Sequence, residues 1–101
     1  MLLKPGTRLK STVCTTELII VRAPAVDVDL RCGGHAVVPT AEDHPSGEVD
    51  PVHSAGSAIG KRYTDEDLGL EALITRAGDG SLSIGDEPMC LKDAKPLPSS
   101  D

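Results

Sequence analysis

Aromatic side chains are almost missing from this sequence of 101 residues, which contains one tyrosine, Tyr63, and neither phenylalanine nor tryptophan. Aromatic residues bury the largest area per side chain, so the core must be built mainly from valine, leucine, isoleucine and alanine. A single domain of this length folds with little margin. We therefore expect part of its stability to come from a protein partner, a second copy of the chain or a metal.

The sequence also lacks a long apolar run. Its first residues, MLLKPGTRLK, do not contain the apolar segment of an export signal. No stretch approaches the roughly eighteen apolar residues that a membrane-spanning helix needs. Three cysteines, an odd number, in such a chain favour free thiols over a disulfide framework. These features predict a cytoplasmic protein that does not insert into membranes.

Positive charge is scarce, because the formal net charge is −6. The charge is also divided unevenly: residues 1–40 carry five bases and three acids, whereas residues 41–101 carry five bases and thirteen acids. A negative chain without interleaved aromatic and basic residues is a poor binder of nucleic acids. The uneven charge favours a basic protein partner, or head-to-tail association of two copies, over a membrane surface.

The sequence does contain an internal similarity. ELIIVRA (17–23) aligns with EALITRA (71–77), and LRCGGHAVV (30–38) aligns with LSIGDEPMC (82–90). Six of these sixteen aligned positions are identical. We interpret the similarity as an internal duplication.

Each copy has the pattern of three short strands. LIIV is a β-branched run that fits a buried strand. VDVDLRC alternates apolar and polar residues, with Cys32 at the end of its apolar face. Gly33 and Gly34 predict a tight turn into a third strand, HAVV, and SLSI and PMCL take the corresponding places in the second copy.

The predicted fold is therefore all-β, in one small domain of two tandem three-stranded meander units. The units span 9–39 and 61–93, a long linker spans 40–60, and an extended tail follows over 94–101. The linker is rich in Pro, Gly, Ser, Ala and His without periodicity. We expect its histidines, His44 and His53, to be exposed to solvent.

One segment, 64–76, fits both a helix and a strand. Thr64, followed three residues later by Asp67, has the pattern of a helix cap. Gly69 and the β-branched Ile74 and Thr75 disfavour a helix. The alignment with ELIIVRA favours a strand over 70–76, after a helical turn at 65–68.

The surroundings of Cys14 and Cys32 resemble a known metal-binding knuckle. Cys14 begins CTTE, a predicted hairpin follows, and Cys32 lies in LRCGG. This arrangement resembles the desulforedoxin-like knuckle, also found at the N-terminus of desulfoferrodoxins, in which C-x-x-C, a short hairpin and C-C-G precede an apolar strand. Glu17 and Gly33 replace the second cysteine of each pair. The second copy has none of the ligands, and its matching residues are Leu68, Glu71, Ile84 and Gly85. The resemblance implies the fold more than the metal, because half or more of the ligands are missing.

Cys14, Cys32 and His35 are the candidate metal ligands. Cysteine and histidine are the usual ligands of zinc, and the spacing from Cys32 to His35 suits a knuckle. A structural zinc needs a fourth ligand, which the spacing does not select from Glu17, His44, His53 and Cys90. Free cysteine is also a common core residue. We therefore expect no cofactor and buried structural thiols, with zinc or iron at this site as the alternative.

Glu17 also has a structural interpretation. Its counterpart Glu71 occurs in a copy without the cysteines, and Arg22 and Arg76 form a second matching pair. A Glu–Arg contact along or across each hairpin accounts for all four residues.

Other catalytic patterns are incomplete. GSAIGKR (56–62) lacks the spacing and the final Ser or Thr of a phosphate-binding loop. DGSLSIGDE lacks the turn glycine of a calcium loop. A nucleophile made of Cys32 and His35 has no evident oxyanion donor.

The sequence thus leaves enzymatic activity open but favours a non-catalytic accessory or interaction subunit. We expect it to bind a larger cytoplasmic enzyme through exposed strand edges. The alternative is a small metal-binding protein in which Cys14 and Cys32 hold zinc or iron in a structural or electron-transfer role.

Overall fold

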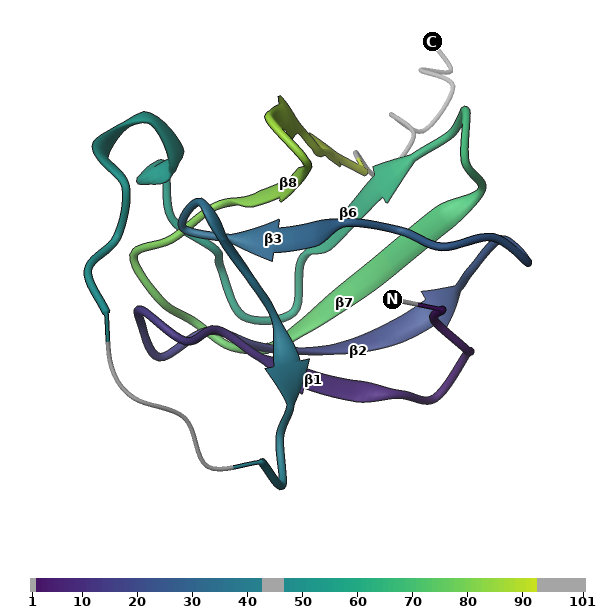
Figure 1. The fold of residues 1–101 in the computed structure, drawn as a ribbon, viewed down its shortest axis with the longest axis horizontal. Coiled ribbons are helices and arrows are strands. Elements are labelled where there is room, and N and C mark those ends of the chain that lie inside the picture. The colour runs from purple at the N-terminus through teal and green to yellow at the C-terminus, as the bar shows by residue number, and fades with distance from the viewer. Residues whose placement is uncertain (1, 43–46, 93–101) are drawn as a thin grey trace, which may run out of the picture.

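The computed structural model describes residues 2–42 and 47–92 of the chain. The regular structure in these ranges consists of ten short strands and one turn of 3-10 helix, η1 (Pro51–His53). The strands form two antiparallel sheets that face each other (Figure 1). The all-β prediction is confirmed. The predicted tail and His44 lie outside the described residues.

The larger sheet has six strands in the order β10-β6-β7-β2-β1-β5. Their bounds are β1 Arg8–Lys10, β2 Glu17–Arg22, β5 Val38–Pro39, β6 Arg62–Asp65, β7 Leu70–Arg76 and β10 Cys90–Leu91. The smaller sheet has the order β4-β3-β8-β9, with β3 Leu30–Cys32, β4 His35–Ala36, β8 Leu82–Ile84 and β9 Glu87–Pro88. Each sheet therefore contains strands from both halves of the chain.

The two sheets are symmetric in their strand order. When β1 is exchanged for β6, β2 for β7 and so on to β5 for β10, each sheet has the same order read from its other edge. The segments that align in the sequence fall on β2 and β7, which pair with each other, and on β3 and β8, which also pair. The predicted tandem meanders differ from this arrangement, because β2 pairs with β1 and β7 rather than with β3. β2 and β7 are the longest strands and contain the most apolar residues. Pairing them places both at the sheet centre, where apolar residues are best covered. The duplication itself stays a prediction.

The core lies between the two sheets and contains aliphatic side chains from both. The largest fully buried apolar residues are Leu9, Leu18, Ile20, Leu70, Ile74, Leu82 and Val37. Cys32 belongs to the same cluster and is completely buried, as the alternation of VDVDLRC predicts. Val26, which starts that alternation, is 53% exposed, because the strand begins only at Leu30.

The segment that fits both a helix and a strand is a β-hairpin, formed by β6 and β7. Its turn contains Gly69, which has a positive φ of 71°. The backbone N–H of Leu68 donates a hydrogen bond to the side chain of Asp65. The preference for a strand over 70–76 is confirmed, and the helical turn expected at 65–68 is a hydrogen-bonded turn instead. β1 and β6 were not predicted.

Within the predicted linker, residues 47–60 form backbone hydrogen bonds with the β3–β4 turn and the β7–β8 loop. The backbone N–H of Asp50 donates to the carbonyl of Gly33, and Ser57 and Gly78 exchange two backbone hydrogen bonds. His53 is 6% exposed, so the expectation of a solvated histidine is wrong there. Its carbonyl accepts a hydrogen bond from the N–H of Ser81, which holds η1 against the β7–β8 loop. No helix within 2–42 and 47–92 is long and apolar enough to span a membrane.

Candidate functional site

Cys14 and Cys32 lie next to each other, and their Sγ atoms are 4.0 Å apart. Cys14 belongs to the loop between β1 and β2, whereas Cys32 ends β3 in the other sheet. The pair therefore connects the two sheets. Cys32 is completely buried, and Cys14 is partly exposed.

The Cys14 sulfur has hydrogen-bonding groups around it. Its thiol donates to the Oγ1 of Thr16 over 3.3 Å, and the backbone N–H of Gly80 donates to the sulfur over 3.4 Å. A hydroxyl can also donate, so Thr16 and Gly80 together can stabilise a thiolate at Cys14. The hydroxyl of Ser11 accepts from the backbone N–H of Cys14 and holds the loop in place.

Two glycines of the β7–β8 loop lie directly against the two sulfurs. A Cβ atom added to Gly78 would meet the Sγ of Cys14 at 3.0 Å, and one added to Gly80 would meet the Sγ of Cys32 at 3.1 Å. The added atoms would also overlap Thr16 and Gly33. The segment AGDG (77–80) of this loop thus covers the thiol pair.

The two thiols have opposite electrostatic environments. Burial raises the pKa of Cys14, but hydrogen bonds from Ser11, Thr16 and the backbone of Gly80 outweigh this effect and lower the pKa from 9.0 to about 7. Burial, and secondly the charge of Cys14, raise the pKa of Cys32 to about 11. Around pH 7 the Cys14 thiol is therefore part thiol and part thiolate, whereas Cys32 stays protonated.

Of the remaining predicted ligands, those in the described part of the chain do not join this pair in a metal-binding group. His35, in β4, is exposed, and Cys90, in β10, is exposed at the edge of the larger sheet. Among the described residues, no group of three or more His, Cys, Asp or Glu side chains is arranged to hold a metal ion. Cys14 and Cys32 would supply two of the four ligands of a structural zinc. Metal binding by Cys14, Cys32 and His35, and the desulforedoxin-like resemblance, stay predictions.

Glu17 takes part in an ion pair. Its Oε2 lies 3.4 Å from the guanidinium of Arg76, on the neighbouring strand β7. The expected Glu–Arg contact is present here, but it joins β2 to β7 instead of forming within one copy. Its counterpart Glu71 is opposite Arg22 in the same strand pair.

Glu71 is a buried carboxylate that forms ion pairs with two basic residues, whereas the sequence pattern predicts only a contact with one arginine. It is 3% exposed, and it lies 2.9 Å from the Nζ of Lys92 and 3.4 Å from the guanidinium of Arg62. A hydrogen bond from Lys92 is the main reason why the pKa of Glu71 is lowered. Glu71 therefore ties β7 to the start of β6 and the end of β10.

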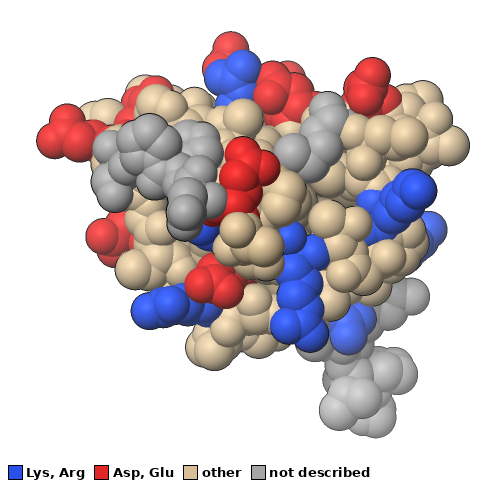
Figure 2. Space-filling model, turned by 60° about the horizontal axis from the view of Figure 1, so that its bottom comes forward, with Lys and Arg blue, Asp and Glu red and all other residues tan. Residues whose placement is uncertain are grey.

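A groove of about 560 Å³ lies beside β10, at the opposite edge of the larger sheet from β5. We call it the acidic groove, because four carboxylates and one ammonium group line it. Its lining residues are Thr64, Asp65, Glu66, Asp67, Glu87, Pro88, Cys90, Leu91 and Lys92. Figure 2 shows the separation of charge on one face of the molecule, with most Lys and Arg side chains in its lower half and many Asp and Glu side chains above and to the left.

The acidic groove belongs to the second half of the chain only. At the aligned positions of the first half, the residues corresponding to Glu66, Asp67 and Glu87 are Thr12, Val13 and His35. The fold therefore does not require acids at these positions. An alignment of the two halves could have found this difference from the sequence. No protein-family model, curated protein or solved structure matches the chain.

Proposed function

We propose that the chain is a non-catalytic accessory subunit, and that its acidic groove binds a basic, extended segment of a larger protein partner. The observation that carries this proposal is the concentration of four carboxylates around an exposed sheet edge. Complementary charge steers a basic partner towards such a surface and suppresses acidic ones.

The position of β10 supports an extended ligand. Within the described residues, β10 pairs with β6 on one side only. An unpaired edge can accept a further strand through backbone hydrogen bonds. Leu91, which is 44% exposed, offers apolar contact beside the carboxylates. An alternating sequence of basic and β-branched residues would satisfy all three features.

A binding titration with defined peptides tests this proposal. The probe is a fluorescein-labelled peptide of alternating Lys and Val, compared with a peptide in which Glu replaces every Lys. We expect the basic peptide to raise the fluorescence anisotropy in a saturable way, and the acidic peptide to leave it unchanged. The affinity should fall several-fold as the ionic strength increases from about 0.05 M to about 0.2 M, because salt screens exposed charges.

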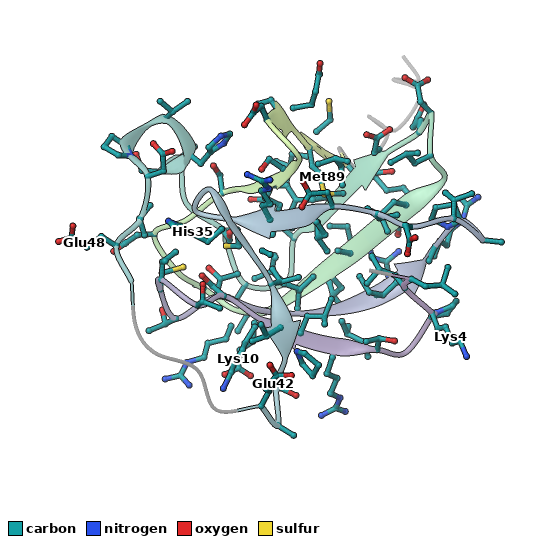
Figure 3. All side chains as sticks on the ribbon, viewed as in Figure 1. Lys4, Lys10, His35, Glu42, Glu48 and Met89 are labelled. Atoms are coloured by element: carbon teal, nitrogen blue, oxygen red, sulfur yellow. The ribbon has the colours of Figure 1, made fainter. Side chains whose placement is uncertain are left out.

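Two pairs of charge reversals distinguish the groove from the net charge. Glu66→Lys with Asp67→Lys reverses two groove acids, and Glu42→Lys with Glu48→Lys makes the same change of net charge elsewhere. Figure 3 shows Glu42 and Glu48 well away from Met89. Met89 marks the position of the groove, because its neighbours in the sequence, Pro88 and Cys90, line the groove. We expect at least a tenfold loss of affinity for the groove pair and less than twofold for the control pair. Equal losses would refute a specific groove.

Self-association is the competing outcome. The basic side chains of Arg8 and Lys10 lie on β1, in the half of the chain without the groove. Sedimentation equilibrium of the unlabelled protein measures whether a second copy occupies the groove. If the protein is a dimer and the groove pair of substitutions dissociates it, the occupant of the groove is a second copy of this chain and not a different protein.

A further inference from the structure

The thiol pair connects the β1–β2 loop to the end of β3, and neither cysteine lines the acidic groove. The docking proposal therefore does not use it. Two cysteines from different hairpins, 18 residues apart, approach each other to 4.0 Å. We propose that Cys14 and Cys32 are a redox site that forms a reversible disulfide, with Cys14 as the attacking thiolate and Cys32 as the resolving thiol. The oxidant is a low-molecular-weight disulfide.

The geometry permits a bond after a small movement. A disulfide has an S–S length of about 2.05 Å, so the sulfurs must approach by about 2 Å. Cys32 is held in β3, between β4 and β8. Cys14 lies in the β1–β2 loop, outside the regular strands. We therefore assign the movement to the Cys14 loop.

The difference in exposure gives the two thiols different roles. An oxidant in solution can reach Cys14, which is partly exposed, but not Cys32, which is completely buried. Thiolate, not thiol, attacks a disulfide. The Gly80 N–H donates to the Cys14 sulfur, and the Thr16 hydroxyl lies within hydrogen-bond distance of it. The lowered pKa of Cys14 agrees with this assignment.

The reaction balances in two steps. First, the Cys14 thiolate attacks one sulfur of the oxidant R–S–S–R, the S–S bond breaks, and one RS⁻ leaves as Cys14–S–S–R forms. The leaving RS⁻ takes up a proton. Secondly, Cys32 loses its proton to solvent, and its sulfur attacks the Sγ of Cys14 and displaces the second RS⁻, which is also protonated. The protein dithiol is oxidised by two electrons, and one R–S–S–R is reduced to two RSH.

The close fit of the β7–β8 loop suits a site that changes between two states. Gly78 and Gly80 allow the loop backbone to touch both sulfurs, so any change in the S–S distance acts on this loop directly. The same loop is bonded to Ser57 and to the carbonyl of His53. Disulfide formation should therefore shift the NMR signals of the loop and of η1.

The test uses the full chain with Cys90→Ser, which removes the exposed third thiol. The protein is equilibrated in buffers of reduced and oxidised glutathione, quenched with acid, alkylated and analysed by intact mass. We expect a transition from two alkylated thiols to none, without bound glutathione, that reverses when the reduced form is restored. In Cys32→Ser or Cys32→Ala on this background, one glutathione should remain attached to Cys14.

Three results would overturn the proposal. A glutathione adduct that persists on Cys14 while Cys32 is present would show that Cys32 does not resolve it. Two thiols that stay alkylatable in oxidised glutathione would show that the sulfurs do not approach. About one zinc or iron per chain, bound by both thiols after purification under reducing conditions, would make the pair a metal site. The Cys90→Ser protein alone decides the first two, so the result does not depend on the folding of the Cys32 variants.

Discussion

At the scale of single residues, the molecule treats two chemically identical thiols differently. Cys32 continues the apolar face of its strand and is part of the core. Cys14 lies among donors in a loop. The alternation of VDVDLRC predicts the burial of Cys32, because a period of two residues assigns side chains to faces. Nothing local predicts the donors around Cys14, since Gly80 is 66 residues away in the chain.

The environment of Cys14 predicts a pH-dependent reactivity. On the Cys90→Ser background, the rate of alkylation of Cys14 by iodoacetamide should rise with a midpoint near pH 7, because the pKa is about 7 and only the thiolate reacts. Thr16→Val removes one hydrogen bond to the sulfur and should move the midpoint upwards. Thr15→Val is the matched control, because the Thr15 hydroxyl donates to the carbonyl of Ala77 instead. Identical midpoints in both variants would contradict the role of Thr16.

The same thiol should make stability depend on pH. Folding lowers the pKa of Cys14 below its value of 9.0, so its stabilising contribution is complete above that value and is lost as the pH falls through about 7. Cys32 acts in the opposite direction, because folding raises its pKa to about 11. Its contribution is complete below about 9 and is lost as the pH rises towards about 11.

His53 shows where reasoning from composition fails. A histidine in a polar segment rich in Pro, Gly and Ser is predicted to be exposed, yet η1 and its hydrogen bond to Ser81 bury it. Residues 47–60 form hydrogen bonds with residues far away in the sequence, and no periodic pattern in the sequence predicts these bonds. A segment without a pattern can therefore still be held firmly.

At the scale of elements, the ion pairs of β2 and β7 differ although they align in the sequence. Glu17 and Arg76 are an exposed pair, with side chains 38% and 64% exposed. Glu71 is 4% exposed on the same measure and has two basic neighbours, Arg62 and Lys92. The two glutamates thus offer a matched comparison within one strand pair.

We expect Glu71→Gln to lower the free energy of unfolding by about 1 kcal/mol, and Glu17→Gln by less than about 0.5 kcal/mol. The bases around Glu71 are half exposed, so water replaces part of the lost interaction. Folding lowers the pKa of Glu71, so its contribution is present above the unfolded value of 4.5 and is lost as the pH falls through the folded value. The difference between Glu71→Gln and the original protein should therefore shrink in acid.

Urea unfolding followed by circular dichroism, near pH 7 and near pH 3, measures these differences. Circular dichroism is the suitable signal because the chain has no tryptophan. Equal destabilisation by the two substitutions near pH 7 would contradict the assigned role of Glu71. Destabilisation by Glu71→Gln that is as large near pH 3 as near pH 7 would also contradict this role.

The existence of several strands could be predicted from the sequence, but their neighbours could not. β2, β3, β7 and β8 contain the apolar or alternating segments on which the prediction rests. β1 and β6, RLK and RYTD, are short and rich in charge, and they are strands because β2 and β7 offer them partners. Tertiary pairing of this kind overrides local propensity.

At the scale of the whole molecule, the two halves interleave. Consecutive strands usually pair with each other, which is why the sequence predicts tandem meanders. Here β2–β7 and β3–β8 join residues that lie about fifty or more positions apart in the sequence, and no local pattern predicts such a pairing. The distribution of charge is more predictable: most acids belong to residues 41–101, and the acidic groove lies in that part of the chain.

The central claim is that the acidic groove binds a basic extended segment. The most direct test is an NMR titration of the ¹⁵N-labelled protein with the alternating Lys and Val peptide. We predict that amide shifts concentrate at 64–67 and 87–92, while the amides around Glu42 and Glu48 stay unchanged. Shifts spread over all exposed acids, or no shifts at saturating peptide, would contradict the claim.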